Sequence, residues 1–266
     1  MCYRRFTSLL VCWVAAAILG TAPDPSRAQD DLVTEAGGTV VAIVDGDTLL
    51  LDDGREIRLV GIQAPKLPLG RPDFAPWPLA DAAKAALERL AMGRGVRLGY
   101  GGRRMDRHGR VLAHLFRDDE AWIQGALLSL GMARVYSFAD NRLRVADMLA
   151  LERRARAAGL GIWSDPFYAV RAAAAVAADI GSFQVVEGRV MRAENVRGRV
   201  YLNFGADWRD DFTVTLAPAV RRRFESEAVD PLGYQGRRVR VRGWIKSFNG
   251  PMIEATHPEQ IEVLTE

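Results

Sequence analysis

The stretch that decides the fold runs from residue 39 to residue 62 and reads TVVAIVDGDTLLLDDGREIRLVGI. Three runs within it alternate in strand fashion: 39–44, 48–51 and 55–62. The segments between them are Asp45-Gly46-Asp47 and Asp52-Asp53-Gly54, and an Asp-Gly pair between apolar runs is a strong hairpin signal. The sequence therefore predicts three strands in a meander.

A proline-rich loop and a series of helices and strands follow this meander. Five prolines between residues 65 and 78 exclude regular structure there. Apolar residues then recur at helical spacing over 79–92, and Gly93 ends the predicted helix. Further strands are predicted at 96–98 and 111–116, and further helices at 121–130 and 141–158. Five short strands broken by one helix are what an OB-type barrel requires, so we expect a mainly β, α+β fold: a five-stranded OB-type barrel with three helices.

The C-terminal third is again rich in predicted strands. They cover 183–191, 199–204, 212–216, 237–246 and 252–264, with one helix at 218–227. This order predicts a second, smaller OB-like β domain over 183–266. The alanine-rich segment 167–182 predicts a linker or short helix, and a last helix of the first domain is an equally good interpretation.

The first 28 residues have the pattern of a secretory signal. Arg4 and Arg5 precede an apolar run over 9–19, and Ser26-Arg27-Ala28 is a small-x-small cleavage site. The alternative is a retained membrane anchor, but the run is short for a bilayer, and we expect no transmembrane segment in the mature chain. We therefore expect a secreted or periplasmic protein. Both cysteines lie within the signal, so the mature chain would have no disulfide.

The overall charge gives no argument for a polyanionic partner. The chain carries a net charge of +3, and the signal accounts for three basic and one acidic residue, which leaves +1. Any case for nucleic acid must therefore come from local groups of residues.

Three blocks of sequence supply such groups: Val44-Asp45-Gly46-Asp47-Thr48, then residues 58–65 (RLVGIQAP), then Asp106-Arg107-His108-Gly109-Arg110. In this order and spacing they resemble the staphylococcal nuclease (thermonuclease) family, and the resemblance extends over about residues 38–166. It implies an OB-fold domain that hydrolyses nucleic-acid phosphodiester bonds with Ca²⁺.

The resemblance assigns roles to four residues that match the family's motifs. Asp47 matches a calcium-binding aspartate, and Asp45 is its neighbour in the motif. Arg58 and Arg110 match the arginines that bind the phosphate. Such a set suits phosphodiester hydrolysis, because carboxylate oxygens hold Ca²⁺ and arginines stay charged while they grip phosphate bidentately.

Three other positions depart from the family's pattern. Gln63 stands at the second calcium-binding aspartate, Ala64 at a threonine, and Lys66 at the glutamate that assists the attacking water. The Gln63 side chain and the Ala64 carbonyl could still support a weakened Ca²⁺ site. Lys66 would repel a cation and would instead favour a metal-free phosphate pocket, or act as a base if its pKa were lowered.

Arg107 and His108 are candidates for substrate binding, together with Lys66, because they lie beside Arg110 in the third block. His108 could exchange protons with a substrate, but an ordinary surface histidine on a turn is the favoured interpretation.

A basic strand in the second domain allows two interpretations. Arg238, Arg240 and Arg242 alternate with valines and would share one face of a strand. With nearby aromatics such as Trp244 and Phe248, that face could bind single-stranded nucleic acid. A solvated charged face over a buried apolar face is the favoured alternative.

The sequence thus favours an exported nuclease or phosphodiesterase that acts on DNA or RNA with a divalent metal, Ca²⁺. The alternatives are a catalytically inactive relative that binds nucleic acid or another polyanion, and an envelope scaffold that contacts protein partners. Gln63 and Lys66 favour the alternatives, whereas Asp45, Asp47, Arg58 and Arg110 together favour the enzyme.

Overall fold

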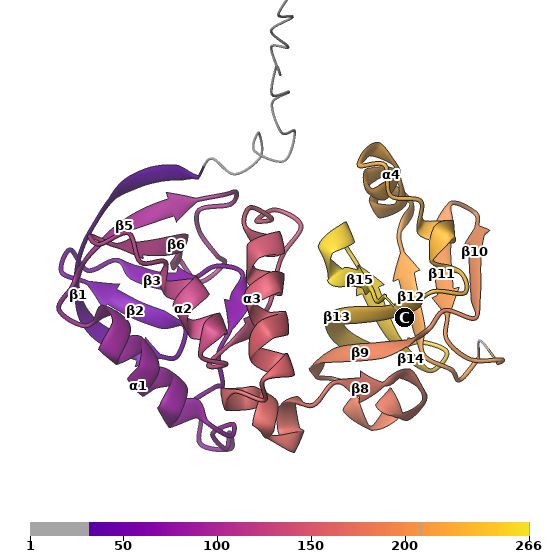
Figure 1. Cartoon of the computed structure of the whole chain (residues 1–266), viewed down its shortest axis with the longest axis horizontal. Coiled ribbons are helices and arrows are strands. Elements are labelled where there is room, and N and C mark those ends of the chain that lie inside the picture. The colour runs from indigo at the N-terminus through magenta and orange to yellow at the C-terminus, as the bar shows by residue number, and fades with distance from the viewer. Residues whose placement is uncertain (1–31, 208, 266) are drawn as a thin grey trace, which may run out of the picture. The chain divides into compact units, whose positions relative to one another are not determined.

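The computed structural model describes residues 32–207 and 209–265 (Figure 1). Residues Asp31–Glu266 form one compact unit, and its buried apolar side chains form two separate cores. The predicted signal at 1–28 lies outside the described residues. In the part of the chain that is described, no helix has the length and apolar character needed to cross a membrane.

The first core fills a closed five-stranded barrel. Its strands are β1 (Val33–Asp45), β2 (Thr48–Leu51), β3 (Glu56–Leu59), β5 (Gly95–Tyr100) and β6 (Val111–Arg117). They close in the order β1-β2-β3-β6-β5, as the predicted OB-type barrel requires. The predicted meander is confirmed, because β1 pairs antiparallel with β2 and β2 pairs antiparallel with β3. Asp45 pairs with Thr48 across the tight turn that contains Asp47, so this turn holds both aspartates at the end of the hairpin.

Three helices cover the barrel: α1 (Ala80–Ala91), α2 (Ile123–Ser129) and α3 (Val145–Ala157). The apolar face of α1 packs into the first core through Ala83, Ala86 and Leu87, as its periodicity predicts. The third helix begins at Val145, four residues later than expected, because Arg144 has a left-handed backbone with φ of 64°. The expected three helices are therefore confirmed with a shorter third member.

A two-stranded sheet beside the barrel was not predicted. It pairs β4 (Ile62–Gln63) with β7 (Arg134–Val135), and each strand is too short to give a periodic pattern. The pairing places Gln63 directly opposite Arg134. This register determines where the Gln63 side chain goes.

The second core lies in a larger sheet with the order β10-β11-β12-β14-β13-β9-β8, in which β15 also pairs with β13. Its elements are β8 (Arg171–Ala172), β9 (Phe183–Arg189), β10 (Arg192–Val196), β11 (Arg199–Asn203), β12 (Thr213–Leu216), α4 (Pro218–Ser226), β13 (Arg238–Ser247), β14 (Pro251–Ala255) and β15 (Ile261–Val263).

The sheet has more strands than the sequence predicted. Polar, exposed β10 pairs at the edge of the sheet with β11 and carries no alternating pattern. The predicted strand 252–264 is two strands, because a short 3₁₀ helix at Pro258–Gln260 separates β14 from β15. The segment 167–182 is folded: β8 pairs with β9, and Val176 is fully buried in the second core.

The expected solvated arginine face on β13 holds at Arg238, which is 58% exposed, but is wrong at Arg240 and Arg242. Arg242 is fully buried, and its guanidinium donates to both carboxylate oxygens of Glu152 on α3, at 3.0 and 3.1 Å. Glu262 on β15 also accepts from Arg242. Arg238 and Arg240 both pair with Glu187 on the neighbouring β9. All three arginines of this strand therefore form ion pairs within the protein.

Candidate active site

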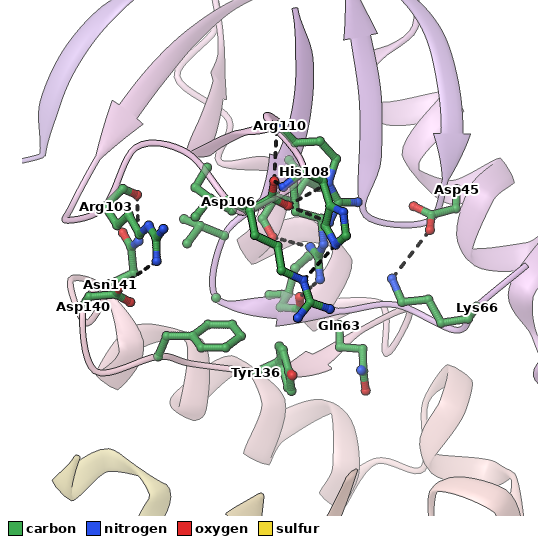
Figure 2. Close-up of a pocket in the computed structure, with 18 of the residues that line it drawn as sticks. Asp45, Gln63, Lys66, Arg103, Asp106, His108, Arg110, Tyr136, Asp140 and Asn141 are labelled. Atoms are coloured by element: carbon green, nitrogen blue, oxygen red, sulfur yellow. Dashed lines mark hydrogen bonds and ion pairs between the residues drawn. The ribbon is translucent and has the colours of Figure 1, made fainter. Parts of the chain in front are cut away.

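A cleft with a volume of about 710 Å³ opens on the first barrel, beside the Asp45 turn (Figure 2). Most of the predicted site residues line it: Asp45, Arg58, Gln63, Lys66, Arg107, His108 and Arg110. The lining includes six basic side chains and three acidic ones, so the cleft is suited to an anionic ligand although the whole chain is almost neutral.

Asp47 lies beneath the cleft and is fully buried. Its carboxylate accepts hydrogen bonds from the Ala64 backbone N–H at 2.7 Å and from Lys66 Nζ at 2.7 and 2.8 Å. Arg58 Nη2 lies 3.2 Å from the same carboxylate. Burial alone would raise the pKa of Asp47, but the charges of Arg58 and Lys66 outweigh it and lower the pKa to about 2. Asp47 is therefore charged, and both of its carboxylate oxygens already have partners within the protein.

Lys66 places its ammonium between the two aspartates of the turn. Besides Asp47, it forms an ion pair with Asp45 Oδ2 at 3.5 Å, which Figure 2 shows as a dashed line. The ammonium thus takes the position where a cation shared by both carboxylates would lie. The pKa of Asp45 is raised, first by burial and then by the nearby charge of Asp47.

Arg58 is turned toward the protein rather than into open solvent. Its Nη2 donates to the Ile62 carbonyl at 2.8 Å, and its Nη1 donates to the Leu59 carbonyl. Together with Asp47, these partners fix the guanidinium at the wall of the cleft. Its positive charge can still act on a bound anion, but few of its N–H groups are free to grip one.

The residues present do not fit the expected Ca²⁺ site. The Gln63 side-chain oxygen accepts from Arg134 Nε and Nη2, at 3.0 and 2.8 Å, and Figure 2 shows the side chain pointing away from Lys66. The Ala64 N–H donates to the Asp47 carboxylate, and both oxygens of that carboxylate already accept hydrogen bonds from Lys66. Among residues 32–207 and 209–265, no group of three or more His, Cys, Asp or Glu side chains is placed to hold a metal. Asp45 and Asp47, already paired with Lys66 and Arg58, lack the free charge and free oxygens that Ca²⁺ requires.

The third sequence block forms a turn that brings Arg110 to the cleft. Asp106 accepts from the backbone N–H groups of His108 and Arg110, and its carboxylate also accepts from Arg110 Nε at 2.8 Å. Burial opposes the effect, but these hydrogen bonds from Arg110 and His108 lower the pKa of Asp106. Arg107 and His108 are both exposed, and Arg107 Nε donates to His108 Nε2 at 3.1 Å. Asp106 therefore positions Arg110, a role that the sequence did not indicate.

Aromatic side chains line part of the same cleft, and only the structure brings them there. Tyr136 and Phe138 follow β7, and Trp244 comes from β13 of the second sheet. Trp244 Nε1 donates to the Tyr136 hydroxyl at 2.9 Å. A run of alternating aromatic residues after β7 was the one available signal for Tyr136 and Phe138, and nothing in the sequence placed Trp244 beside them.

A closed five-stranded barrel with a turn of two aspartates and two arginines at one cleft is the arrangement of a nuclease-type domain. The family model described as staphylococcal nuclease homologue matches residues 56–165. Protein ParB of Escherichia coli is 33% identical over 174 residues, which cover 61% of this chain and 88% of that protein. An uncharacterized endonuclease of Escherichia coli is 32% identical over 139 residues, which cover 50% of this chain and 81% of the relative.

A thermonuclease of Staphylococcus intermedius is 26% identical over 166 residues, which cover 59% of this chain and 96% of that enzyme. The chain belongs to the family of staphylococcal nuclease homologues. The family model ends at residue 165, so the second sheet lies outside the match.

Proposed function

We propose that this protein is a nuclease that binds nucleic acid in the cleft and hydrolyses its phosphodiester bonds. The observation that carries the proposal is the basic cleft itself, in which Arg58, Lys66 and Arg110 from the matched region meet Asp45 from the turn that precedes it. Relatives named endonuclease and thermonuclease support the same reaction class.

Each charged residue of the cleft has a separate role in the proposed reaction. Arg110 and Lys66 bind the phosphodiester oxygens, and the fixed charge of Arg58 stabilises the negative charge that develops there. Asp45 accepts a proton from the attacking water, because it lines the cleft and burial raises its pKa. As the bond from phosphorus to the water oxygen forms, the bond to the leaving oxygen breaks, and that oxygen takes up a proton from solvent water.

We further propose that Ca²⁺ has no part in this reaction at the Asp45–Asp47 position. The Lys66 ammonium supplies a positive charge there, held by ion pairs of 2.7 and 3.5 Å. Together with Arg58, this tethered ammonium balances the charge of the two carboxylates, whatever the Ca²⁺ concentration. Export remains a separate proposal, supported by the pattern of residues 1–28 alone.

A second candidate function is binding of nucleic acid without cleavage. The observation that favours it is Lys66 itself, since a charged ammonium cannot accept a proton from water. The basic cleft would then hold phosphates and leave them intact.

One experiment separates these candidates. Labelled DNA and RNA are incubated in EDTA with the purified protein, with Asp45→Asn and with Arg110→Ala. Arg222→Ala, an exposed arginine of α4, is the matched control. We expect cleavage by the unmodified protein and the control, loss of cleavage with retained binding in Asp45→Asn, and loss of both in Arg110→Ala. Salt-sensitive binding with no cleavage by the unmodified protein would support the second candidate.

A further inference from the structure

The cleft has an aromatic side as well as a basic one. Tyr136, Phe138 and Trp244 line it together with the basic side chains. Figure 2 shows Tyr136 across the drawn cavity from Arg110 and His108. Nucleic acid has two matching kinds of group: its phosphates are anionic and suit basic side chains, and its bases have flat π-faces that suit aromatic side chains.

Trp244 lines the cleft with its polar atom already hydrogen-bonded. Its Nε1 already donates to the Tyr136 hydroxyl at 2.9 Å, so the indole has no unmet hydrogen bond. The side chain nevertheless stays 46% exposed, and Phe138 stays 47% exposed. A large aromatic surface with a satisfied polar group and free faces is suited to stacking.

The aromatic side is held in place by packing. The Tyr136 ring makes edge contacts with Phe138 and with Phe183 of β9, each with ring centroids 4.8 Å apart. Phe183 pairs with Trp244 in the register of β9 and β13. Two residues before Trp244 on the same strand, Arg242 is locked by its buried ion pair with Glu152 on α3. The second sheet therefore positions Trp244 rigidly at the cleft.

We propose that Trp244 is a nucleobase-stacking residue and that the cleft takes single-stranded nucleic acid. This inference rests on the proposed function, to which it adds the class of substrate. A base can lie on the indole only when it is unpaired and splayed away from its neighbours, as in a single strand. A duplex keeps its bases stacked inside and presents only phosphates to such a cleft. The second sheet, which lies outside the family match, thereby contributes to substrate choice.

The test compares Trp244→Ala and Trp244→Phe with the unmodified protein. The matched control is Phe248→Ala, which removes another exposed aromatic side chain near the end of β13 that lines a different cavity. Binding is measured by fluorescence polarisation in EDTA with four labelled probes: oligo-dT, oligo-rU, a duplex, and an abasic oligonucleotide that keeps the phosphates. Thermal unfolding of each variant checks that it is folded.

We expect Trp244→Ala to weaken binding of oligo-dT and oligo-rU by about 5- to 150-fold, the usual contribution of one stacked base. Trp244→Phe should restore part of this affinity, since it keeps a ring. Abasic and duplex probes should bind the variant and the unmodified protein alike, and Phe248→Ala should change nothing.

Two outcomes overturn the inference. Equal losses for abasic and base-containing strands would show that Trp244 supports the fold of the cleft, and an unchanged affinity for oligo-dT would show that no base stacks there. In either case, cleavage or binding by the unmodified protein would leave the proposed function intact. If the unmodified protein binds none of the four probes, the proposed function itself fails.

Discussion

Two clusters of buried charge, one at the cleft and one between α3 and β13, are built alike and serve different ends. Each has a fully buried carboxylate, Asp47 or Glu152, held by more than one cation. At the cleft the Lys66 side chain keeps 22% of its surface exposed, whereas Arg242 keeps 1%. A buried ion pair alone therefore does not identify a site. The cluster must also present a charge to an open cavity.

The pKa values of the carboxylates can be compared between the two clusters. Burial opposes both effects, but Lys66 and Arg58 lower the pKa of Asp47, and Arg242 lowers the pKa of Glu152. Both carboxylates are thus charged at neutral pH. Each cluster also has a second carboxylate, Glu262 beside Arg242 and Asp45 beside Lys66, and the pKa of Asp45 is raised by burial.

The largest expected effect is on stability, at the buried cluster of Glu152 and Arg242 between α3 and β13. Glu152→Ala leaves Arg242 buried without its main partner and removes the acceptor for the Val135 N–H. We expect a loss of about 3–5 kcal/mol in the free energy of unfolding, measured by urea denaturation. The double variant Glu152→Leu/Arg242→Met should recover most of that loss, because it removes both charges. A loss below about 1 kcal/mol in Glu152→Ala would contradict the structural role of this cluster.

Acid should lower the stability of the folded protein through His257, which is buried beside Ser137. Its Nε2 lies 2.7 Å from the Ser137 hydroxyl, and burial lowers its pKa from 6.5 to about 4. Because the unfolded chain takes up this proton first, the stability from a neutral His257 is complete above pH 6.5. It is lost as the pH falls toward 4, at a cost of about 3 kcal/mol.

Unfolding measured from pH 7 to pH 4 in His257→Asn should lose this part of the pH dependence. His114, whose pKa is also lowered to about 4 by burial, would keep its own share in that variant. An unchanged pH profile in His257→Asn would show that His257 is not held neutral at this position.

At the cleft, reversing two of the three departures from the family's pattern should create a metal site. Gln63→Asp with Lys66→Glu removes the ammonium that pairs with Asp45 and Asp47 and restores the family's carboxylates at positions 63 and 66. Thermal unfolding of this variant should respond to Ca²⁺, with a gain of about 2.7 kcal/mol when Ca²⁺ is one hundred times its Kd. The unmodified protein should show no gain. A Ca²⁺-dependent rise in the unmodified protein would contradict our assignment of Lys66.

Much of this arrangement could be predicted from local sequence, and some could not. The Asp45-Gly46-Asp47 turn and the block ending in Arg110 are local signals, and the resemblance to the family implied that they form one site, which the cleft bears out. The Gln63–Arg134 contact depends on residues 71 positions apart that meet in a two-stranded sheet too short to predict. Arg242 and Glu152 are 90 positions apart, and an arginine that alternates with valines has the same pattern whether its face is solvated or buried.

The smallest expected effect on stability is in Lys66→Met, which should cost about 1 kcal/mol because Arg58 still holds Asp47 and Lys66 is partly exposed. Its effect on ligand binding should be much larger, since the two carboxylates would then face a phosphate without the ammonium. Oligonucleotide affinity measured at several salt concentrations should show a smaller salt slope in this variant. An unchanged slope would mean that Lys66 makes no contact with the bound strand.

The most direct test of our central claim, that Lys66 takes the place of a metal cation, is the affinity of the unmodified protein for a single-stranded oligonucleotide in EDTA and in Ca²⁺. We predict the same affinity and the same cleavage rate in both, with both sharply reduced in Lys66→Met. Binding or cleavage that disappears in EDTA and returns with Ca²⁺ would contradict the claim.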